Sequence, residues 1–184
     1  NNRYMEKEQP IHGVLWLNEK NAAKKLYYLS REWQYFPDHL LTPEMLKKDP
    51  GYYSRYISIG EYGGMEMGNR ADSPYGCGTY RMLLILPEEE QTWAIALTEV
   101  FSAYRIYIDG ELAGEVGNPD EEDYEGRIMN RVYTFNGKGT VEIVIDVADR
   151  SSVESGIRYI PVLGNPVQVN MQRGIRVLHN GFAM

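Results

Sequence analysis

Apolar and polar residues alternate with a period of two along most of this chain, which is the pattern of half-buried β-strands. The clearest runs cover residues 79–86, 93–97 and 103–109. Pro87 and the acidic turn at residues 88–91 separate the first two runs. After the third, Asp109-Gly110 supplies the positive backbone angles that a tight hairpin turn requires. This part of the chain therefore predicts antiparallel sheet.

The last third of the chain continues the strand pattern. Runs at residues 130–135 and 140–147 flank Asn136-Gly137, which predicts a second hairpin. Within the second run, Val141, Ile143, Ile145 and Val147 should face the core, while Glu142 and Asp146 should face outward under the partial cover that Val144 indicates. Further strands are expected at residues 159–163 and 167–171. Eight to ten strands in total predict an all-β fold, an antiparallel β-sandwich or jelly roll.

The first sixty residues are less regular. An apolar run covers residues 11–17, and an aromatic-rich segment at residues 24–36 predicts two strands or one bent strand. Thr42 and Pro43 are typical of a helix start, and Asp49-Pro50-Gly51 of a stop, so we expect one short helix near residues 43–48. A strand should follow at residues 56–59. We expect residues 1–24 to form an irregular segment packed on the domain, residues 25–172 the jelly roll, and residues 173–184 a tail.

Composition and charge exclude several classes of function. The chain has 184 residues, enough for one core, and a formal net charge of -7 without a basic stripe, which disfavours nucleic acid and anionic membranes as partners. Its single cysteine, Cys77, cannot form an internal disulfide. His12, His39 and His179 show no metal-ligand spacing, so we expect neither a metal site nor a cofactor. No run of 18 apolar residues is present to span a membrane.

The longest segment without strand pattern, residues 60–78, is the leading candidate for a ligand site. It contains Met65 and Met67, which suit filling of gaps better than binding. Arg81 and Arg105 lie inside strands, where ion pairing is favoured over donation to a ligand. The acidic loop at residues 118–127 is favoured as a solvated turn over a calcium site. The candidate ligand-binding residues are Trp33, Tyr35, Tyr62, Glu66, Arg70, Asp72, Tyr75 and Arg81.

Several of these stretches carry a family resemblance. The segments GTYRMLLILP, SAYRIYIDGELAGEVG and TVEIVIDVAD resemble the galactose-binding-like jelly roll that forms the sugar-binding domain of family 2 glycoside hydrolases. REWQYFPDHLLTPE and IPVLGNPVQV resemble the extracytoplasmic sensor domain of bacterial seven-transmembrane receptors with diverse intracellular signalling modules. The resemblance implies that residues 78–81 form a sheet-entry motif and Gly164 a closing turn. It implies no catalytic residue.

The resemblance implies two of the functions that we consider, and the predicted sheet leaves a third open. The first is a non-catalytic, extracytoplasmic ligand-sensing domain of a bacterial multi-pass signalling receptor of the histidine kinase or diguanylate cyclase type. Its ligand would be a small molecule, with carbohydrate the leading class, and membrane helices would begin beyond Arg173 and Arg176. The alternative is a carbohydrate-binding module of a glycoside hydrolase. A third possibility is a protein-interaction β-sandwich whose sheet face or edge takes a partner strand. The sequence leaves a homodimer open, and it disfavours catalysis by the acid pair Glu66 and Asp72.

Overall fold

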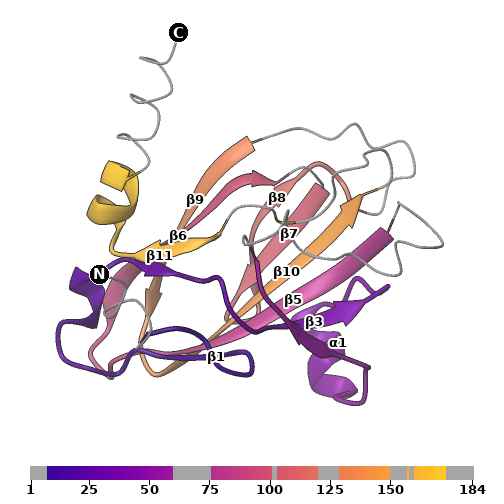
Figure 1. Ribbon diagram of the computed structural model, residues 1–184, viewed down its shortest axis with the longest axis horizontal. Coiled ribbons are helices and arrows are strands. Elements are labelled where there is room, and N and C mark those ends of the chain that lie inside the picture. Colours follow the sequence, from indigo (N-terminus) through magenta and orange to yellow (C-terminus); the bar gives the residue numbers. More distant parts are fainter. Residues whose placement is uncertain are drawn as a thin grey trace, which may run out of the picture.

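Two β-sheets packed face to face form the protein (Figure 1). The computed structural model describes residues 8–59, 76–100, 103–119, 129–149, 157 and 160–172. The larger sheet has seven strands: in spatial order β4 (Arg55–Ile57), β3 (Trp33–Pro37), β5 (Gly76–Ile85), β10 (Thr140–Asp149), β7 (Ala103–Ile108) and β8 (Glu111–Val116), with β1 (Val14–Trp16) also beside β5. The smaller sheet contains β2 (Tyr27–Tyr28), β11 (Val162–Gly164), β6 (Gln91–Val100) and β9 (Met129–Gly137). This architecture confirms the predicted all-β sandwich.

The main core lies between the two sheets. Alternate side chains of β5 and β10 point into it, as the period-two pattern predicts. Some of their outward neighbours, such as Arg81 and Glu142, are partly exposed, whereas Val144 and Asp146 are buried. The smaller sheet contributes Trp93, Ile95 and Leu97 to the same core. The core-facing positions predicted on β10 are confirmed, since the exposed fraction is 3% or less at Val141, Ile143, Ile145 and Val147. The residues between these core-facing positions therefore form the outer face of the larger sheet.

Two short strands share one edge of β5. Antiparallel β3 pairs with its first half, up to Gln34 opposite Arg81, and β1 then pairs with its second half, from Val14 opposite Leu83. The β1 pairing is parallel, an exception to the antiparallel pattern that we predicted. The segment at residues 24–36 does hold two strands, but they belong to different sheets. The 3-10 turn η2 (Ala22–Lys24) leads from β1 to β2.

The predicted hairpin at Asp109-Gly110 is confirmed. It joins β7 to β8, and φ is 49° at Asp109 and 86° at Gly110, the left-handed values that a primed turn needs. The amide of Asp109 donates a 2.7 Å hydrogen bond to the carbonyl of Glu142 on β10. This bond fixes the turn against the neighbouring strand β10.

The hairpin predicted at Asn136-Gly137 is wrong. Both residues lie inside β9, and the chain turns two residues later, where Gly139 has φ 60°. The strands on either side do not pair: β9 pairs with β6 in the smaller sheet, and β10 pairs with β5 and β7 in the larger one. The connection therefore crosses from one sheet to the other. Local turn chemistry marks a reversal, but it does not decide which strand the chain pairs with afterwards.

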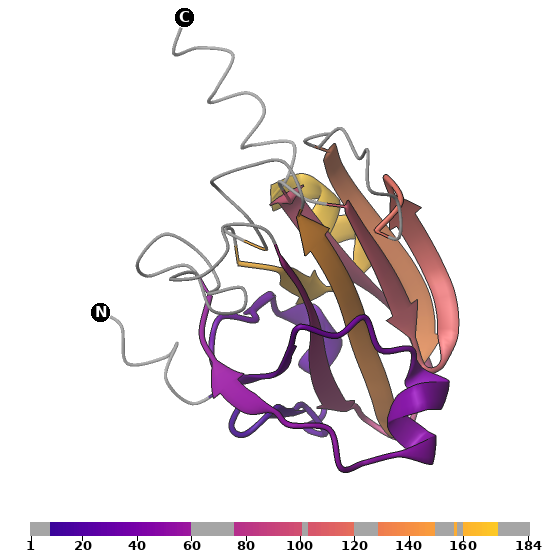
Figure 2. The ribbon, with the colours of Figure 1, turned by 90° about the vertical axis from the view of Figure 1, so that its right-hand side faces the viewer.

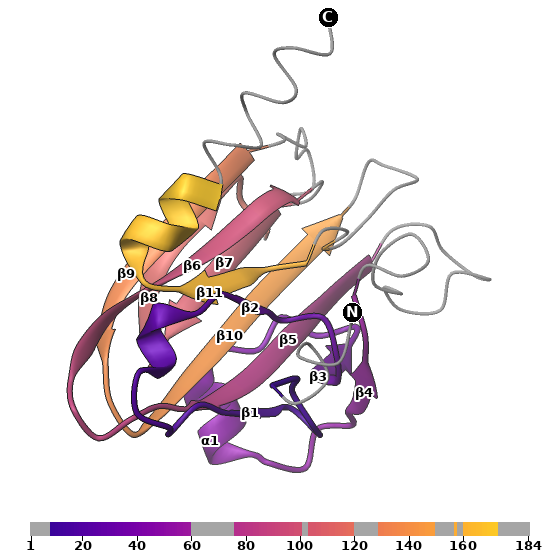
Figure 3. The same ribbon diagram turned by 60° about the vertical axis from the view of Figure 1, so that its left-hand side comes forward.

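The strand predicted at residues 167–171 is also wrong, because residues 166–172 form a helix. Asn165 caps it by accepting the amide of Gln168 at 2.9 Å, and Pro166 stands at its first position. Val169 packs against the outer face of the smaller sheet, whereas Val167 and Met171, four residues apart, share the exposed face. Figure 3 shows this helix, in yellow, beside β11 and β6. Of the three alternating apolar residues that suggested a strand, only Val169 therefore packs against the sheet.

Replacing Asn165 by alanine should destabilise the protein by about 1–2 kcal/mol, because the helix loses its cap. The Asn165 side chain also donates to the carbonyl of Ala23 at 2.8 Å, a tertiary bond that the same change removes. Urea unfolding followed by circular dichroism measures the change. Asn170→Ala is the matched control, since its exposed side chain donates to the carbonyl of Pro166 within the helix and, among the described residues, makes no bond to the sheets. Equal losses in both variants would contradict the capping role.

Asp146 lies on the outer face of the larger sheet, as predicted, but its cover is more than partial, because it is only 1% exposed. After β3 the chain crosses the outer face of β5 and β10 before it enters α1 (Pro43–Lys48). Figure 2 shows this crossing in front of β10. Thr79 holds it: its hydroxyl accepts the amide of Leu41 at 2.9 Å and lies 2.8 Å from a carboxylate oxygen of Asp146 and 2.9 Å from the carbonyl of His39. The crossing segment, residues 38–42, therefore covers Asp146.

The helix at α1 confirms the predicted start and stop. Thr42 accepts the amide of Met45 at 3.2 Å, and Pro43 occupies the first position. None of its residues is buried, so α1 stands at the side of the sheet without closing down on it. This position leaves space between the helix and the outer face of the larger sheet.

Candidate functional site: a groove between helix α1 and the larger sheet

The space beside α1 is a groove of about 570 Å³ on the outer face of the larger sheet. We call it the α1 groove. Its floor comes from β3, β5 and β10, one wall comes from α1 and the residues after it, and the β7–β8 turn closes one end. The lining residues are Gln34, Phe36, Pro43, Glu44, Leu46, Lys47, Pro50, Arg81, Asp109, Gly110 and Glu142.

Arg81 is the central polar residue of the floor. Its side chain points outward from β5, because Tyr80 and Met82 on either side of it are fully buried. Its Nε donates to Glu142 Oε2 at 2.7 Å, and its Nη1 donates to Gln34 Oε1 at 3.2 Å. A guanidinium has five N–H donors, so three remain without a partner among the described residues. With 28% of its side chain exposed, Arg81 can offer these donors to a ligand.

Neighbouring strands hold the Arg81 side chain in place. Gln34 lies directly opposite Arg81 in the β3–β5 register, and its own Nε2 donates to Ser54 Oγ at 3.0 Å. Glu142 sits on β10, on the other side of β5. The guanidinium is therefore anchored from two strands before any ligand arrives, which lowers the entropy cost of binding. Such anchoring favours recognition of a ligand with fixed geometry.

The walls of the groove add apolar surface and exposed charges. Phe36 on the floor is 3% exposed, and Pro43, Leu46 and Pro50 line the side of α1. Glu44 is paired with Lys48 at 2.9 Å, one turn along the helix, while Lys47 is exposed. The described lining holds two basic side chains, Arg81 and Lys47, and three acidic ones, Glu44, Asp109 and Glu142. This balance of donors and acceptors suits a neutral, many-hydroxyl ligand better than a strong anion.

The structure separates the eight residues that the sequence offered as ligand-binding. Trp33 and Tyr35 are 0% exposed, because their strand positions face the core. They serve as core residues and have no free ring face to offer, so the ligand-binding role predicted for both is corrected. Arg81 alone of the three described candidates lines a groove. Of the remaining candidates, Tyr62, Glu66, Arg70, Asp72 and Tyr75 lie outside the described residues.

The loop that we predicted at residues 60–78 is shorter at its end, since β5 begins at Gly76. Its other residues lie outside the described part of the chain, as do Met65, Met67, most of the acidic loop and His179. The ion pairing favoured for both strand arginines is confirmed. Arg105 Nε donates to Glu115 Oε2 at 2.9 Å, just as Arg81 Nε donates to Glu142 Oε2. Arg105 does not line the α1 groove.

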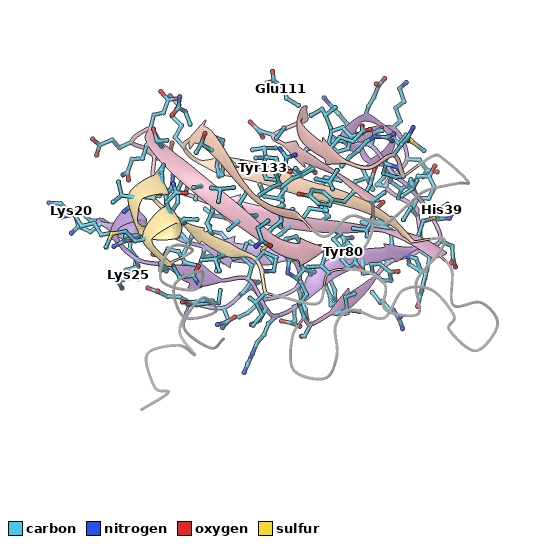
Figure 4. All side chains as sticks on the ribbon, turned by 90° about the horizontal axis from the view of Figure 1, so that it is seen from above. Lys20, Lys25, His39, Tyr80, Glu111 and Tyr133 are labelled. Carbon is cyan, nitrogen blue, oxygen red and sulfur yellow. The ribbon has the colours of Figure 1, made fainter. Side chains whose placement is uncertain are left out.

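A second hollow, of about 650 Å³, lies at the open edge of the sandwich between β8 and β9. The hydroxyls of Tyr104 and Tyr133 are 2.7 Å apart beside it and link the two sheets. Burial raises the pKa of Tyr104 far above its ordinary value, and burial raises the pKa of Tyr133 as well, so both phenols are neutral at physiological pH. Figure 4 shows Tyr133 among the strands and Glu111 pointing away from them. The two tyrosines therefore connect the sheets. The described residues that line this hollow include no lysine or arginine, so it lacks the charged donors of the α1 groove.

Sequence reasoning missed Gln34, Glu142 and the role of α1 in the groove. Glu142 was expected only to face outward, and Gln34 carried no signal of its own. The one available signal was pairing: a strand-interior arginine needs partners, and the neighbouring strands must supply them. Without the register of β3, β5 and β10 those partners could not be named.

Several solved structures contain a domain of similar fold. A β-glucuronidase from Faecalibacterium prausnitzii matches 80% of this chain with a TM-score of 0.54 at 13% identity, and the match covers 32% of that enzyme. A GH2 β-galacturonidase from Eisenbergiella tayi, bound to galacturonate, matches 77% of the chain with a TM-score of 0.50 at 13% identity, over 24% of its own length. The chain has the galactose-binding-like jelly-roll fold. It spans a quarter to a third of the length of these enzymes.

A putative β-galactosidase from Bacteroides fragilis shows the same relation, with a TM-score of 0.50 over 76% of this chain and 23% of that enzyme at 14% identity. No protein-family model and no curated protein matches the sequence. Within the described residues, no three histidine, cysteine, aspartate or glutamate side chains are grouped as metal ligands. The helices in that same part of the chain are too short to cross a membrane.

Proposed function

We propose that this protein is a non-catalytic carbohydrate-binding domain whose α1 groove holds a neutral sugar. The observation that carries the proposal is the anchored guanidinium of Arg81, which lines the groove with three N–H donors left over from its bonds to the described residues, beside carboxylate acceptors. Vicinal hydroxyls of a sugar both donate and accept, so they can bridge Arg81 and Glu142. The likeness to domains of GH2 enzymes supports the sugar as the ligand class at the level of fold alone.

Charge argues for a neutral sugar over a uronate. The similar enzymes are described with galacturonate or as glucuronidases, which concerns those proteins. In this chain three acidic side chains of the groove outnumber two basic ones, and Glu142 already shares the guanidinium. A ligand carboxylate in the groove would be repelled by these like charges, which lowers the free energy gained on binding. We therefore expect galactose or glucose units to bind more tightly than the corresponding uronates.

Replacing Arg81 by methionine should weaken sugar binding by about tenfold or more, since charged hydrogen bonds are lost while the strand keeps an apolar side chain. Isothermal titration with galactose, glucose, galacturonate and short neutral oligosaccharides measures the dissociation constants. Lys47→Ala, an exposed change in the wall, is a second variant that leaves the Arg81–Glu142 pair intact. It should weaken binding by a smaller factor, because Lys47 is a flexible wall residue rather than an anchored donor.

Arg105→Met is the matched control for this experiment. Arg105 also lies within a strand of the larger sheet and pairs with a cross-strand glutamate, but its guanidinium lies outside the groove. Its loss should therefore leave sugar affinity unchanged. Equal affinity of the Arg81→Met and wild-type proteins would reject the groove as the site. Absence of binding to every sugar tested would reject the proposed function.

The wider context of the domain is a separate part of the proposal. We propose an extracytoplasmic location, with the domain passing ligand binding to an attached module. The sensor role in a seven-transmembrane receptor rests on the sequence resemblance alone, and the role as a module of a glycoside hydrolase has the added support of the shared fold. Sequence of the full gene separates them: seven apolar helices support the receptor, and a glycosidase catalytic domain supports the enzyme module.

A further inference from the structure

Trp16 is a large aromatic side chain that lies exposed on the same sheet face as the α1 groove. Its neighbour Leu15 is 0% exposed and belongs to the core, so the alternation of β1 directs Trp16 to the outer face, where it is 65% exposed. In the parallel pairing with β5, Trp16 stands opposite Ile85. Arg81, the central residue of the groove, is on the same strand and also faces outward.

A continuous strip of surface joins the two positions. Along β5, Leu83 and Ile85 follow Arg81 on the outer face and are partly exposed, and Val14 lies beside Leu83. On the other side of β5, Glu142 pairs with Leu83 and the exposed Thr140 pairs with Ile85. The strip therefore has an apolar floor and a hydroxyl and a carboxylate along one border. We call it the outer strip (Val14, Trp16, Leu83 and Ile85).

The length of the outer strip decides what can occupy it. Ile85 is four positions after Arg81 on β5, which is roughly 13 Å at the rise of a β-strand, and Trp16 lies one strand further across. A single sugar ring in the groove cannot reach the indole of Trp16, whereas a chain of several rings can.

We propose that the ligand is an oligosaccharide that runs from the α1 groove over Leu83 and Ile85 to an aromatic subsite at Trp16. This inference rests on the function proposed above and names the size of its ligand. The apolar face of a pyranose ring packs on an indole, and its equatorial hydroxyls then point sideways to polar groups such as Thr140 and Glu142. Trp16 also borders a small hollow lined by Glu19, Lys20 and Asn21, which adds donors and acceptors at that end.

The test compares ligand lengths in one family of neutral sugars, from the monosaccharide to the tetrasaccharide. In the wild-type protein, affinity should rise by about tenfold or more once the chain is long enough to reach Trp16. Trp16→Ala should remove that gain and leave the monosaccharide affinity unchanged. Arg81→Met should weaken binding of every length. Tyr53→Ala, which removes an aromatic ring that is 70% exposed but lines neither the groove nor the outer strip, is the control and should change nothing.

The outcomes separate this inference from the function on which it rests. If no neutral sugar binds, the proposed function fails and the subsite fails with it. If the monosaccharide binds but length brings no gain, or if Trp16→Ala keeps the gain, the subsite alone is overturned. Sedimentation of both proteins without ligand adds a third check: a dimer that Trp16→Ala dissociates would assign the outer strip to a second copy of the chain and overturn the oligosaccharide reading.

Discussion

Replacing Trp33 by alanine is expected to lower the free energy of unfolding by about 3–5 kcal/mol. Trp33 is 0% exposed and belongs to the main core, and its indole N–H donates to the carbonyl of Leu29 at 2.8 Å. The truncation removes a large apolar side chain, leaves a cavity, and deprives the Leu29 carbonyl of its partner. Urea unfolding followed by tryptophan fluorescence and circular dichroism measures the loss.

Two further variants test whether Trp33 has a structural role only. Tyr53→Ala removes an aromatic side chain that is 70% exposed and should change stability by less than about 0.5 kcal/mol. Trp33→Phe keeps most of the apolar volume and should fold, so its sugar affinity can be measured. We expect that affinity to match the wild type. A Trp33→Phe protein that is stable but no longer binds sugar would restore the ligand-binding role predicted from the sequence.

Thr79→Val should destabilise the protein by about 2–4 kcal/mol, although the two side chains have nearly the same shape. The Thr79 hydroxyl is fully buried and accepts the amide of Leu41, which is itself 1% exposed. It also lies within hydrogen-bond distance of the buried carboxylate of Asp146. Valine satisfies neither group, so a buried N–H loses its acceptor and a buried carboxylate loses a donor. Urea unfolding gives the free energy.

Hydrogen exchange identifies where the Thr79→Val protein loosens. Because the hydroxyl ties the crossing segment to β5, the amide of Leu41 should exchange much faster in the variant. Thr92→Val is the control, since the Thr92 hydroxyl bonds to Asn136 at an exposed position on the smaller sheet. The crossing segment leads directly into α1, so sugar affinity should fall in Thr79→Val as the groove wall loosens. Unchanged Leu41 exchange would contradict the anchoring role.

The structure corrects the sequence predictions where a pattern had two physical solutions. Alternating Val167, Val169 and Met171 fit a strand, but Asn165 and Pro166 start a helix, and the sheet needs only Val169 as cover. Asn136-Gly137 fits a hairpin, but the strands that flank the turn complete different sheets. In both cases local propensity was ambiguous and long-range pairing made the choice.

The candidate site shows the same division. Arg81 was named from the sequence, and its partners were not, because Gln34, Arg81 and Glu142 come from three strands far apart in the chain. Trp33 and Tyr35 were offered as a binding surface because aromatic side chains suit sugar stacking and cores equally well. Burial decided between these roles, and burial depends on which face of β3 meets the second sheet.

The sequence by itself determined the features that depend on neighbours along the chain. Strand alternation, the turn at Asp109-Gly110 and the helix start at Thr42-Pro43 follow from backbone geometry and from hydrogen bonds between residues a few positions apart. Only the tertiary structure decided which strands share a sheet, that the crossing segment covers Asp146, and that Arg81 and Trp16 lie on one face. These arrangements depend on contacts between segments that are distant in the chain. Bringing such segments together costs chain entropy, and the burial of the whole apolar core offsets that cost.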